Sequence, residues 1–312
     1  MRSIPSVHAW SPAGRSVIHR VVYCRGGLSE GFPPPLTFHP AQPLCVLLWQ
    51  WSGRFDWQPV DREGIPERLH TPVSGHLVVR GPMSTPWRTI AEGAPEQLWV
   101  WLYPDGLERA LGIRPGSLRD DWEPWHPSPT NRRQSEACAG IFAEGWTPAT
   151  GGRLAELLGE TDLQLVPNSR PPSLTAWRRR LQGLLHQTLS KCGLRTAHRR
   201  HRRLCGMTAQ ELDRLAKVDA ALQKLLGGPT PLKGQLGRVA SECGFCDQSY
   251  LIRSVRQATG WSPTELRKGV AGNASFWPYR ALYPPLAERT DSAEAGRASL
   301  EAATSRRVST VR

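Results

Sequence analysis

Two pairs of arginines with the same spacing are the residues of this sequence best suited to bind a ligand. Arg199 and Arg202 lie seven and four residues before Gly206, and Arg253 and Arg256 precede a second glycine by the same intervals. Residues three apart lie on one face of a helix, so each pair projects its guanidinium groups to one side. Guanidinium groups bind phosphate oxygens and the edges of bases, and two such helices suit two successive turns of DNA.

The arginine pairs belong to a unit that occurs twice, 54 residues apart, between about residues 184 and 270. Gly206–Leu212 (GMTAQEL) returns as Gly260–Leu266 (GWSPTEL), and each copy has Thr or Ser followed three residues later by Glu. This spacing is typical of a capping box at the start of a helix. The repeat therefore predicts two similar supersecondary units, each with a basic helix.

Positive charge is concentrated in the segment that contains the repeat. The chain of 312 residues has a formal net charge of +13, and residues 173–270 contain 18 Lys and Arg against six Asp and Glu. A basic surface kept for solubility would spread this charge, whereas a domain that binds a polyanion concentrates it. The charge distribution therefore favours a nucleic-acid partner.

The second copy has the pattern of a helix, a turn and a second helix. Asp247 stands where it can cap the second helix, and Ser262-Pro263-x-Glu265 starts a further helix after Gly260. The second helix should leave polar and basic side chains facing a major groove. The buried faces are Leu236, Val239 and Ala240, then Leu251, Val255 and Ala258, and the exposed side chains are Gln248, Ser249, Ile252, Arg253 and Arg256.

The first copy is more basic and less regular. Its exposed positions are Arg195, His198, Arg199 and Arg202, and His201 stands in a buried position between Ala197 and Leu204. We expect His201 to be a partly exposed structural histidine. The turn before this helix is about three residues shorter than in the second copy. The scaffold helix near Leu184–Leu189 is therefore less well defined.

An amphipathic helix at Ala209–Leu226 connects the two copies. With roughly 1.5 Å per residue it would be about 26 Å long. A connector of this length can hold two recognition helices about one turn of DNA apart, roughly 34 Å.

The remainder of the chain divides by composition into segments that we expect to differ in structure. Apolar, Trp-rich runs between Pro, Gly and Asp predict strands at Cys45–Trp51, His76–Arg80 and Gln97–Tyr103. The expected segments are an irregular N-terminal part (1–40), a β-rich sensor or dimerisation domain (41–165), a linker (166–172), the double helix-turn-helix domain (173–270), a C-terminal extension (271–287) and a disordered tail (288–312).

The cysteines and apolar runs bear on the compartment. There are seven cysteines, an odd number, and the first 30 residues lack the apolar core of a signal peptide. The longest apolar run, Leu44–Trp49, is too short to cross a membrane. We therefore expect a cytoplasmic protein with free thiols and no membrane partner.

Residues for catalysis or metal binding do not form a known pattern. The sequence has no phosphate loop, nucleophile elbow or His-Glu-x-x-His, and Cys243-x-x-Cys246 has no second pair to complete a zinc site. We expect no enzymatic activity, no metal and no cofactor. The alternative is a metal site of irregular spacing, made of His39, His70 and His76 with Glu67 or Glu96.

Residues 244–263 (GFCDQSYLIRSVRQATGWSP) resemble the second-motif signature of AraC/XylS-family transcription regulators. The resemblance implies an α+β chain, with a β-rich N-terminal domain followed by an all-α domain in which a long helix joins two helix-turn-helix motifs. Residues 72–79, 98–104 and 107–112 are more weakly similar to the family's N-terminal domains, and 274–280 resemble a segment that follows the DNA-binding domain. By position, the family's base-reading residues fall on Arg195, His198 and Arg199 and on Gln248, Ser249, Ile252 and Arg253.

The resemblance implies a sequence-specific transcription regulator with double-stranded DNA as its partner. It leaves open a small-molecule effector, RNA polymerase and a second copy of the chain as further partners. The alternative is an architectural or RNA-binding protein whose basic helices contact phosphates alone, with little sequence preference and steep salt dependence. Gln248 and Ser249 in the exposed register favour base recognition over that alternative.

Overall fold

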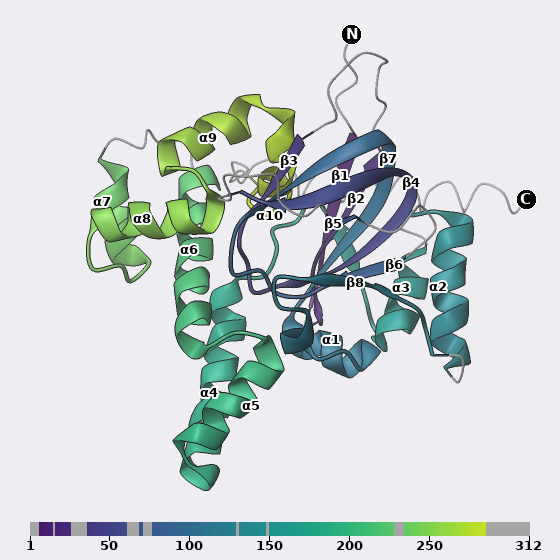
Figure 1. Ribbon diagram of the computed structural model, residues 1–312, viewed down its shortest axis with the longest axis horizontal. Coiled ribbons are helices and arrows are strands. Elements are labelled where there is room, and N and C mark those ends of the chain that lie inside the picture. The colour runs from purple at the N-terminus through teal and green to yellow at the C-terminus, as the bar shows by residue number, and fades with distance from the viewer. Residues whose placement is uncertain are drawn as a thin grey trace, which may run out of the picture.

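The computed structural model describes residues 6–14, 16–25, 36–60, 69–70, 77–128, 131–147, 150–227 and 234–284. Figure 1 shows a twisted sheet with α2 and α3 beyond one side and the helices that follow residue 174 beyond the other. This arrangement confirms the α+β fold class, with a β-rich part followed by a helical part.

The strands form one antiparallel sheet with its longest strands at the centre. β4 and β7 pair with each other, β2, β1 and β9 extend the sheet on one side, and β6 and β8 extend it on the other. β3 pairs with β7, and β5 pairs with β4. The strands are β1 (Ser6–Pro12), β2 (Ile18–Arg25), β3 (Leu36–His39), β4 (Cys45–Pro59), β5 (Leu69–His70), β6 (Leu77–Arg80), β7 (Trp87–Leu102), β8 (Trp122–Trp125) and β9 (Leu165–Pro167).

Alternate residues of the sheet face two different apolar cores. On β7, Trp99 and Trp101 belong to one core, and Leu98, Val100 and Leu102 belong to the other, as the two-residue period of a strand requires. The core that contains Leu98 is closed by α1 (Pro104–Leu111), α2 (Arg132–Glu144) and α3 (Gly151–Leu158). The core that contains Trp99 is shared with the C-terminal helices. Both faces are covered, which explains why the central strands are apolar on both sides.

Two expectations for the first half of the chain are wrong. Residues 1–40, expected to be irregular, contain β1, β2 and β3 among their described residues, because short apolar runs pair there despite the surrounding Pro, Gly and Ser. The linker 166–172 begins inside β9, and the Asn168 N–H donates to the Ala9 carbonyl at 2.8 Å. The start of this segment is therefore part of the sheet edge.

The predicted helices of the second half are confirmed, with one change of length. The connector predicted at Ala209–Leu226 is α6 (Ala209–Gly227). The scaffold helix of the first copy is much longer than Leu184–Leu189, because α4 already begins at Leu174, where the Ser173 side chain accepts from the Thr175 N–H. The remaining elements are η1 (Pro115–Leu118), α4 (Leu174–Cys192), α5 (Leu194–Cys205), α7 (Gln235–Glu242), α8 (Gln248–Thr259), α9 (Pro263–Gly272), η3 (Ala274–Phe276) and α10 (Trp277–Leu282).

The C-terminal extension packs against the sheet. Trp277 of α10 contacts Trp99 with ring centroids 5.7 Å apart, Phe276 lies 5.0 Å from Phe38, and Tyr279 is fully buried. The tail predicted at 288–312 lies outside the described residues. None of the described helices is long and apolar enough to span a membrane.

Asp219 lies where the C-terminal extension meets α4 and α6. Its carboxyl group accepts from the Leu174 backbone N–H, from the Tyr283 hydroxyl and from the Gln223 amide, the last at 3.1 Å. Burial raises its pKa from 3.8 to about 7. Between about pH 4 and pH 7 the native state therefore keeps a proton on Asp219 that the unfolded state has lost.

We predict that Asp219→Asn gains stability relative to the wild type as pH rises. Between about pH 4 and pH 7 the buried Asp219 increasingly lowers the free energy of unfolding of the wild type, because its ionised form is disfavoured in the native state. Asn cannot ionise and has no such effect. Chemical denaturation should show the stability difference, variant minus wild type, rising by about 2–4 kcal/mol from pH 5 to pH 8. Asp162→Asn, at an exposed carboxylate, serves as the control. A difference for Asp219→Asn that is constant with pH contradicts the prediction.

Candidate nucleic-acid interface

The two basic helices are structurally equivalent. α5 and α8 are each 12 residues long and start and end 54 residues apart. Each ends at a left-handed glycine, Gly206 with φ 72° and Gly260 with φ 82°, whose N–H bonds the carbonyls of Arg202 and Arg256. The sequence repeat is therefore a repeat of structure down to the hydrogen bonds of the helix ends.

α8 begins and packs as the sequence predicts. The Asp247 carboxylate accepts from the Tyr250 N–H at 2.7 Å, and this hydrogen bond, with that from the Cys246 thiol, lowers the pKa of Asp247. Leu251, Val255 and Ala258 are fully buried. The opposite face exposes Gln248, Ser249, Arg253 and Arg256, and Ile252 is half-buried.

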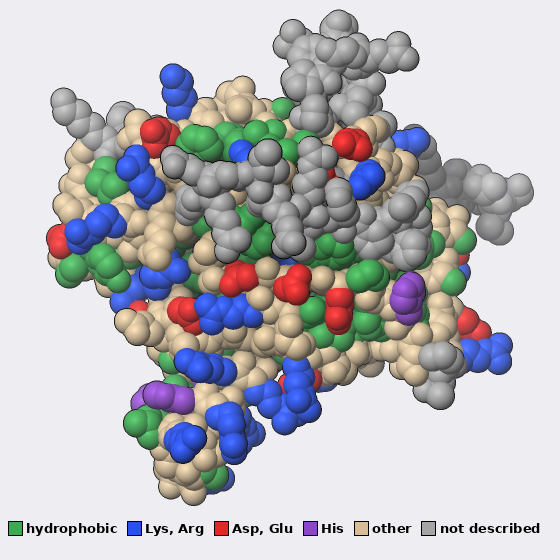
Figure 2. Space-filling view, in the orientation of Figure 1, with side chains coloured by type: hydrophobic (Ala, Val, Ile, Leu, Met, Phe, Trp, Pro, Cys, Tyr) green, Lys and Arg blue, Asp and Glu red, His purple; other side chains and the backbone are tan. Residues whose placement is uncertain are grey.

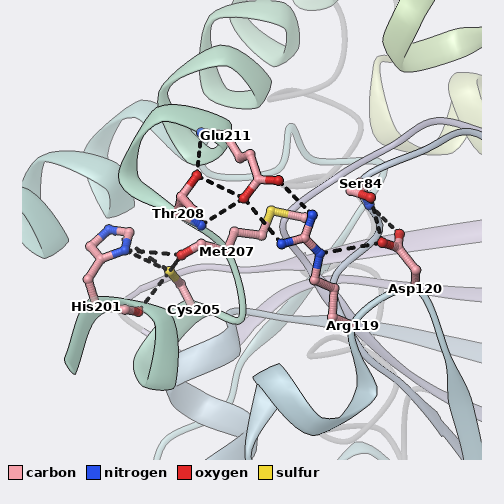
Figure 3. Close-up of polar contacts among 8 residues, drawn as sticks. All are labelled: Ser84, Arg119, Asp120, His201, Cys205, Met207, Thr208 and Glu211. Carbon is pink, nitrogen blue, oxygen red and sulfur yellow. Dashed lines mark hydrogen bonds and ion pairs between the residues drawn. The ribbon is translucent and has the colours of Figure 1, made fainter. Parts of the chain in front are cut away.

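His201 of α5 is buried, which corrects the expectation of a partly exposed histidine. Its Nδ1 lies 3.2 Å from the Met207 carbonyl oxygen and 3.3 Å from the Cys205 thiol, as Figure 3 shows. Burial lowers the pKa of His201, so the ring is neutral near pH 7. The buried position accommodates a histidine because a ring nitrogen forms a hydrogen bond with the carbonyl of Met207, the residue after Gly206.

The exposed face of α5 holds the remaining predicted residues. Arg195, His198, Arg199 and Arg202 are exposed and, with Leu194, line an open hollow of about 640 Å³. Leu194 is 61% exposed, an unusual position for a large apolar side chain. Leu194 was not among the residues predicted from the sequence. The signal was an apolar residue outside the buried stripe at the start of a basic helix.

The turn of the first motif is shorter than that of the second, as predicted. Only Gly193 separates α4 from α5, with φ 78° and ψ 167°, a conformation that favours glycine. Five residues, Cys243–Asp247, separate α7 from α8. The first motif therefore enters its basic helix through a single residue, four fewer than the second motif.

Ion pairs separate the arginines of the first motif into two groups. Arg203 pairs with Glu108 of α1 at 2.9 Å, and Arg180 of α4 pairs with Asp105 at 2.8 Å. Within the described residues, Arg195, Arg199, Arg202 and Arg253 have no ion pair. In the first motif, the arginines that face the sheet half are paired with carboxylates, whereas Arg195, Arg199 and Arg202 on the outer face are not. Figure 2 shows Lys and Arg side chains gathered over the region of α4 and α5.

The alternative metal site lies largely outside the described residues. No group of three or more His, Cys, Asp or Glu side chains that could hold a metal occurs among the described residues. His39 is buried in an aromatic stack, with its ring centroid 5.2 Å from that of Trp99. Glu67 and His76 lie outside the described residues, as does the side chain of His70.

Comparisons with known proteins identify the helical segment. A helix-turn-helix domain model matches residues 189–269. No curated protein matches the chain. Similar solved structures include ToxT from Vibrio cholerae O395 (10% identity, TM-score 0.40, 86% of this chain and 99% of ToxT) and the AraC-like transcriptional activator CuxR (11%, 0.19, 88% and 90%). Vicilin from hazelnut, Corylus avellana, is also similar (16%, 0.23, 55% and 46%).

The TM-scores of these whole-chain matches are too low to assign a function. The domain match at residues 189–269 agrees with the two equivalent helices α5 and α8 that lie within it. The chain therefore carries a helix-turn-helix domain in residues 189–269, the segment that contains the two equivalent basic helices α5 and α8.

Proposed function

We propose that this protein is a sequence-specific DNA-binding transcription regulator that places α5 and α8 in two adjacent major grooves. The equivalence of α5 and α8, each with exposed arginines at the same positions, carries this proposal. α6, a helix of 19 residues, joins the two motifs. At roughly 1.5 Å per residue it extends about 28 Å, close to one turn of DNA.

The nine candidate residues have different roles in this proposal. Residues near the N-terminal half of each helix enter the groove and contact base edges, and those near the C-terminal half contact phosphates. Base contacts are assigned to Arg195, His198, Arg199, Gln248, Ser249, Ile252 and Arg253, and phosphate contacts to Arg202 and Arg256.

The exposed side chains of α8 support base recognition over a purely architectural role. Gln248 and Ser249 are exposed beside Arg253, and uncharged hydrogen-bonding groups recognise bases as well as phosphates. The proposal places the protein in the cytoplasm, with DNA as its partner. RNA polymerase and a second copy of the chain are further partners that it allows.

We further propose that the sheet half binds a small anionic effector at Arg80. Arg80 is 4% exposed, and its Nε and Nη1 have no hydrogen-bond partner among the described residues. Its guanidinium carbon lies 5.5 Å from the Trp57 ring centroid. With the Gln42 amide oriented so that its oxygen accepts, Nη2 donates to that oxygen at 3.2 Å. Burial lowers the pKa of Arg80 to about 9. A buried, unpaired cation is costly, and a carboxylate ligand would offset that cost.

The first test selects bound sequences from a library of random duplexes at physiological salt. Two boxes about one turn apart would support recognition by both helices, and a single box would limit base recognition to one motif. Tight binding at low salt without any enriched sequence would contradict sequence specificity and favour the architectural alternative.

We predict that Arg253→Ala and Arg202→Ala weaken binding in different ways. Arg253→Ala should cost about 1–3 kcal/mol on the selected site and relax the preference at one base position. Arg202→Ala should weaken binding to selected and random duplexes about equally, because phosphates carry no base identity. Fluorescence anisotropy on both duplexes measures this. Equal losses from both variants on both duplexes would exclude base recognition by Arg253.

We predict that Arg80→Met is at least as stable as the wild type when no ligand is present. Replacement of an unpaired buried charge by an apolar side chain of similar length removes its desolvation cost. Straight-chain carboxylates from acetate to octanoate should raise the melting temperature of the wild type and leave that of Arg80→Met unchanged. The exposed Arg132→Met is the control. A strongly destabilised Arg80→Met together with a wild type that responds to no carboxylate contradicts the effector site.

A further inference from the structure

Two equivalent glutamates, one in each motif, have different partners. Glu265, at the third residue of α9, pairs with Arg256 of the preceding helix at 3.5 Å. Glu211, at the same position 54 residues earlier, pairs instead with Arg119, which follows η1 in the sheet half. Figure 3 shows the Arg119 guanidinium turned toward the Glu211 carboxylate, with contacts of 2.6 Å and 3.3 Å.

Both glutamates are fixed in place by the helix that follows each motif. The Glu211 carboxylate accepts from the Thr208 N–H and hydroxyl, both at 2.8 Å, and the Glu265 carboxylate accepts from the Ser262 N–H at 2.8 Å and hydroxyl at 2.6 Å. The capping boxes therefore hold a negative charge at the same site in each motif. At this site the motifs differ in which arginine pairs with the glutamate.

Arg202 has no ion-pair partner within the described part of the chain. It is the structural equivalent of Arg256, yet the glutamate at the matching position, Glu211, pairs with Arg119. Arg202 is exposed at the edge of the hollow on α5. Its full charge is available to a phosphate, whereas that of Arg256 is partly neutralised by Glu265.

Arg119 is held by the sheet half rather than by the helices. The next residue, Asp120, has a left-handed φ of 56°, and its carboxylate accepts from the Ser84 N–H and hydroxyl, both at 2.5 Å. The Asp120 N–H donates to the Pro82 carbonyl at 3.0 Å. Gly206, at the end of α5, packs so closely against Pro82 and Pro115 that a Cβ there would lie 2.6 Å from Pro82. The turn before β7 therefore fixes both Arg119 and the end of α5.

We propose that Arg119 is a positioning residue for DNA binding, which neutralises Glu211 so that Arg202 can contact a phosphate. The sheet half, through Arg119, thereby determines how much positive charge the first motif presents to DNA. This inference rests on the proposed DNA binding and adds a residue outside the helix-turn-helix domain to it.

The test is the salt dependence of DNA binding, which reports the number of phosphates that the protein neutralises. Each phosphate contact contributes about 0.9 to the slope of log K against log salt concentration. Arg119→Met should lower the slope by about this amount and weaken binding several-fold at low salt, because the charge of Glu211 then opposes that of Arg202. Fluorescence anisotropy on one selected duplex over a range of salt concentrations measures both values.

Rescue separates this role from a structural one. Arg119→Met/Glu211→Gln should regain the wild-type slope, since Gln keeps the capping box without the charge. Arg202→Ala should lower the slope by itself, and Arg119→Met should add nothing to it. Glu265→Gln is the matched variant in the second motif and should raise the slope, because it frees Arg256. The surface variant Arg132→Met should leave the slope unchanged.

Two outcomes would overturn the inference while DNA binding stands. One is a wild-type slope in Arg119→Met, and the other is a lowered slope that Glu211→Gln does not restore. A wild-type protein that binds no duplex even at low salt would overturn the proposed function, and this inference with it. The expected slopes with intact melting curves would support both.

Discussion

The packing of the C-terminal helices against one face of the sheet is the contact on which the rest of the structure depends. Trp99 meets Trp277 there, Phe38 meets Trp261 and Phe276, and the Ala41 N–H donates to the Ala258 carbonyl at 2.7 Å. One apolar cluster thus runs from the sheet through α6 and α8 to α10. Burial of this area excludes water from both halves at once and fixes α8 relative to the sheet.

The glycines that end α5 and α8, Gly206 and Gly260, pack both basic helices against the sheet half. A Cβ on Gly260 would lie 2.7 Å from Val60, and Gly206 has the corresponding close contact with Pro82. Each helix therefore touches the sheet half at its end and leaves its beginning free. On the side of the first motif that faces the sheet, Glu108 of α1 pairs with Arg203, and Arg119 pairs with Glu211.

Local patterns in the sequence predicted most of the helical half. The cap at Asp247, the capping boxes and the buried stripe of α8 all depend on residues within a few positions of one another, so they are visible in sequence. β1 and β2 were missed because their apolar runs are short and their stability comes from pairing in the sheet. The ion pair of Arg119 could not be predicted, since its partner Glu211 lies 92 residues away. The burial of His201 required the position of the Met207 carbonyl.

The shared apolar cluster also decides what counts as a folding unit in this chain. Trp277 and Tyr279 are buried by contacts that include the sheet, although they follow the helix-turn-helix segment in sequence. Cutting the chain before α4 would leave a broad aromatic surface in water on both fragments, and such surfaces drive aggregation. Melting of the intact protein should accordingly be one cooperative transition, in which loss of the sheet also disrupts the packing of α8 and α10.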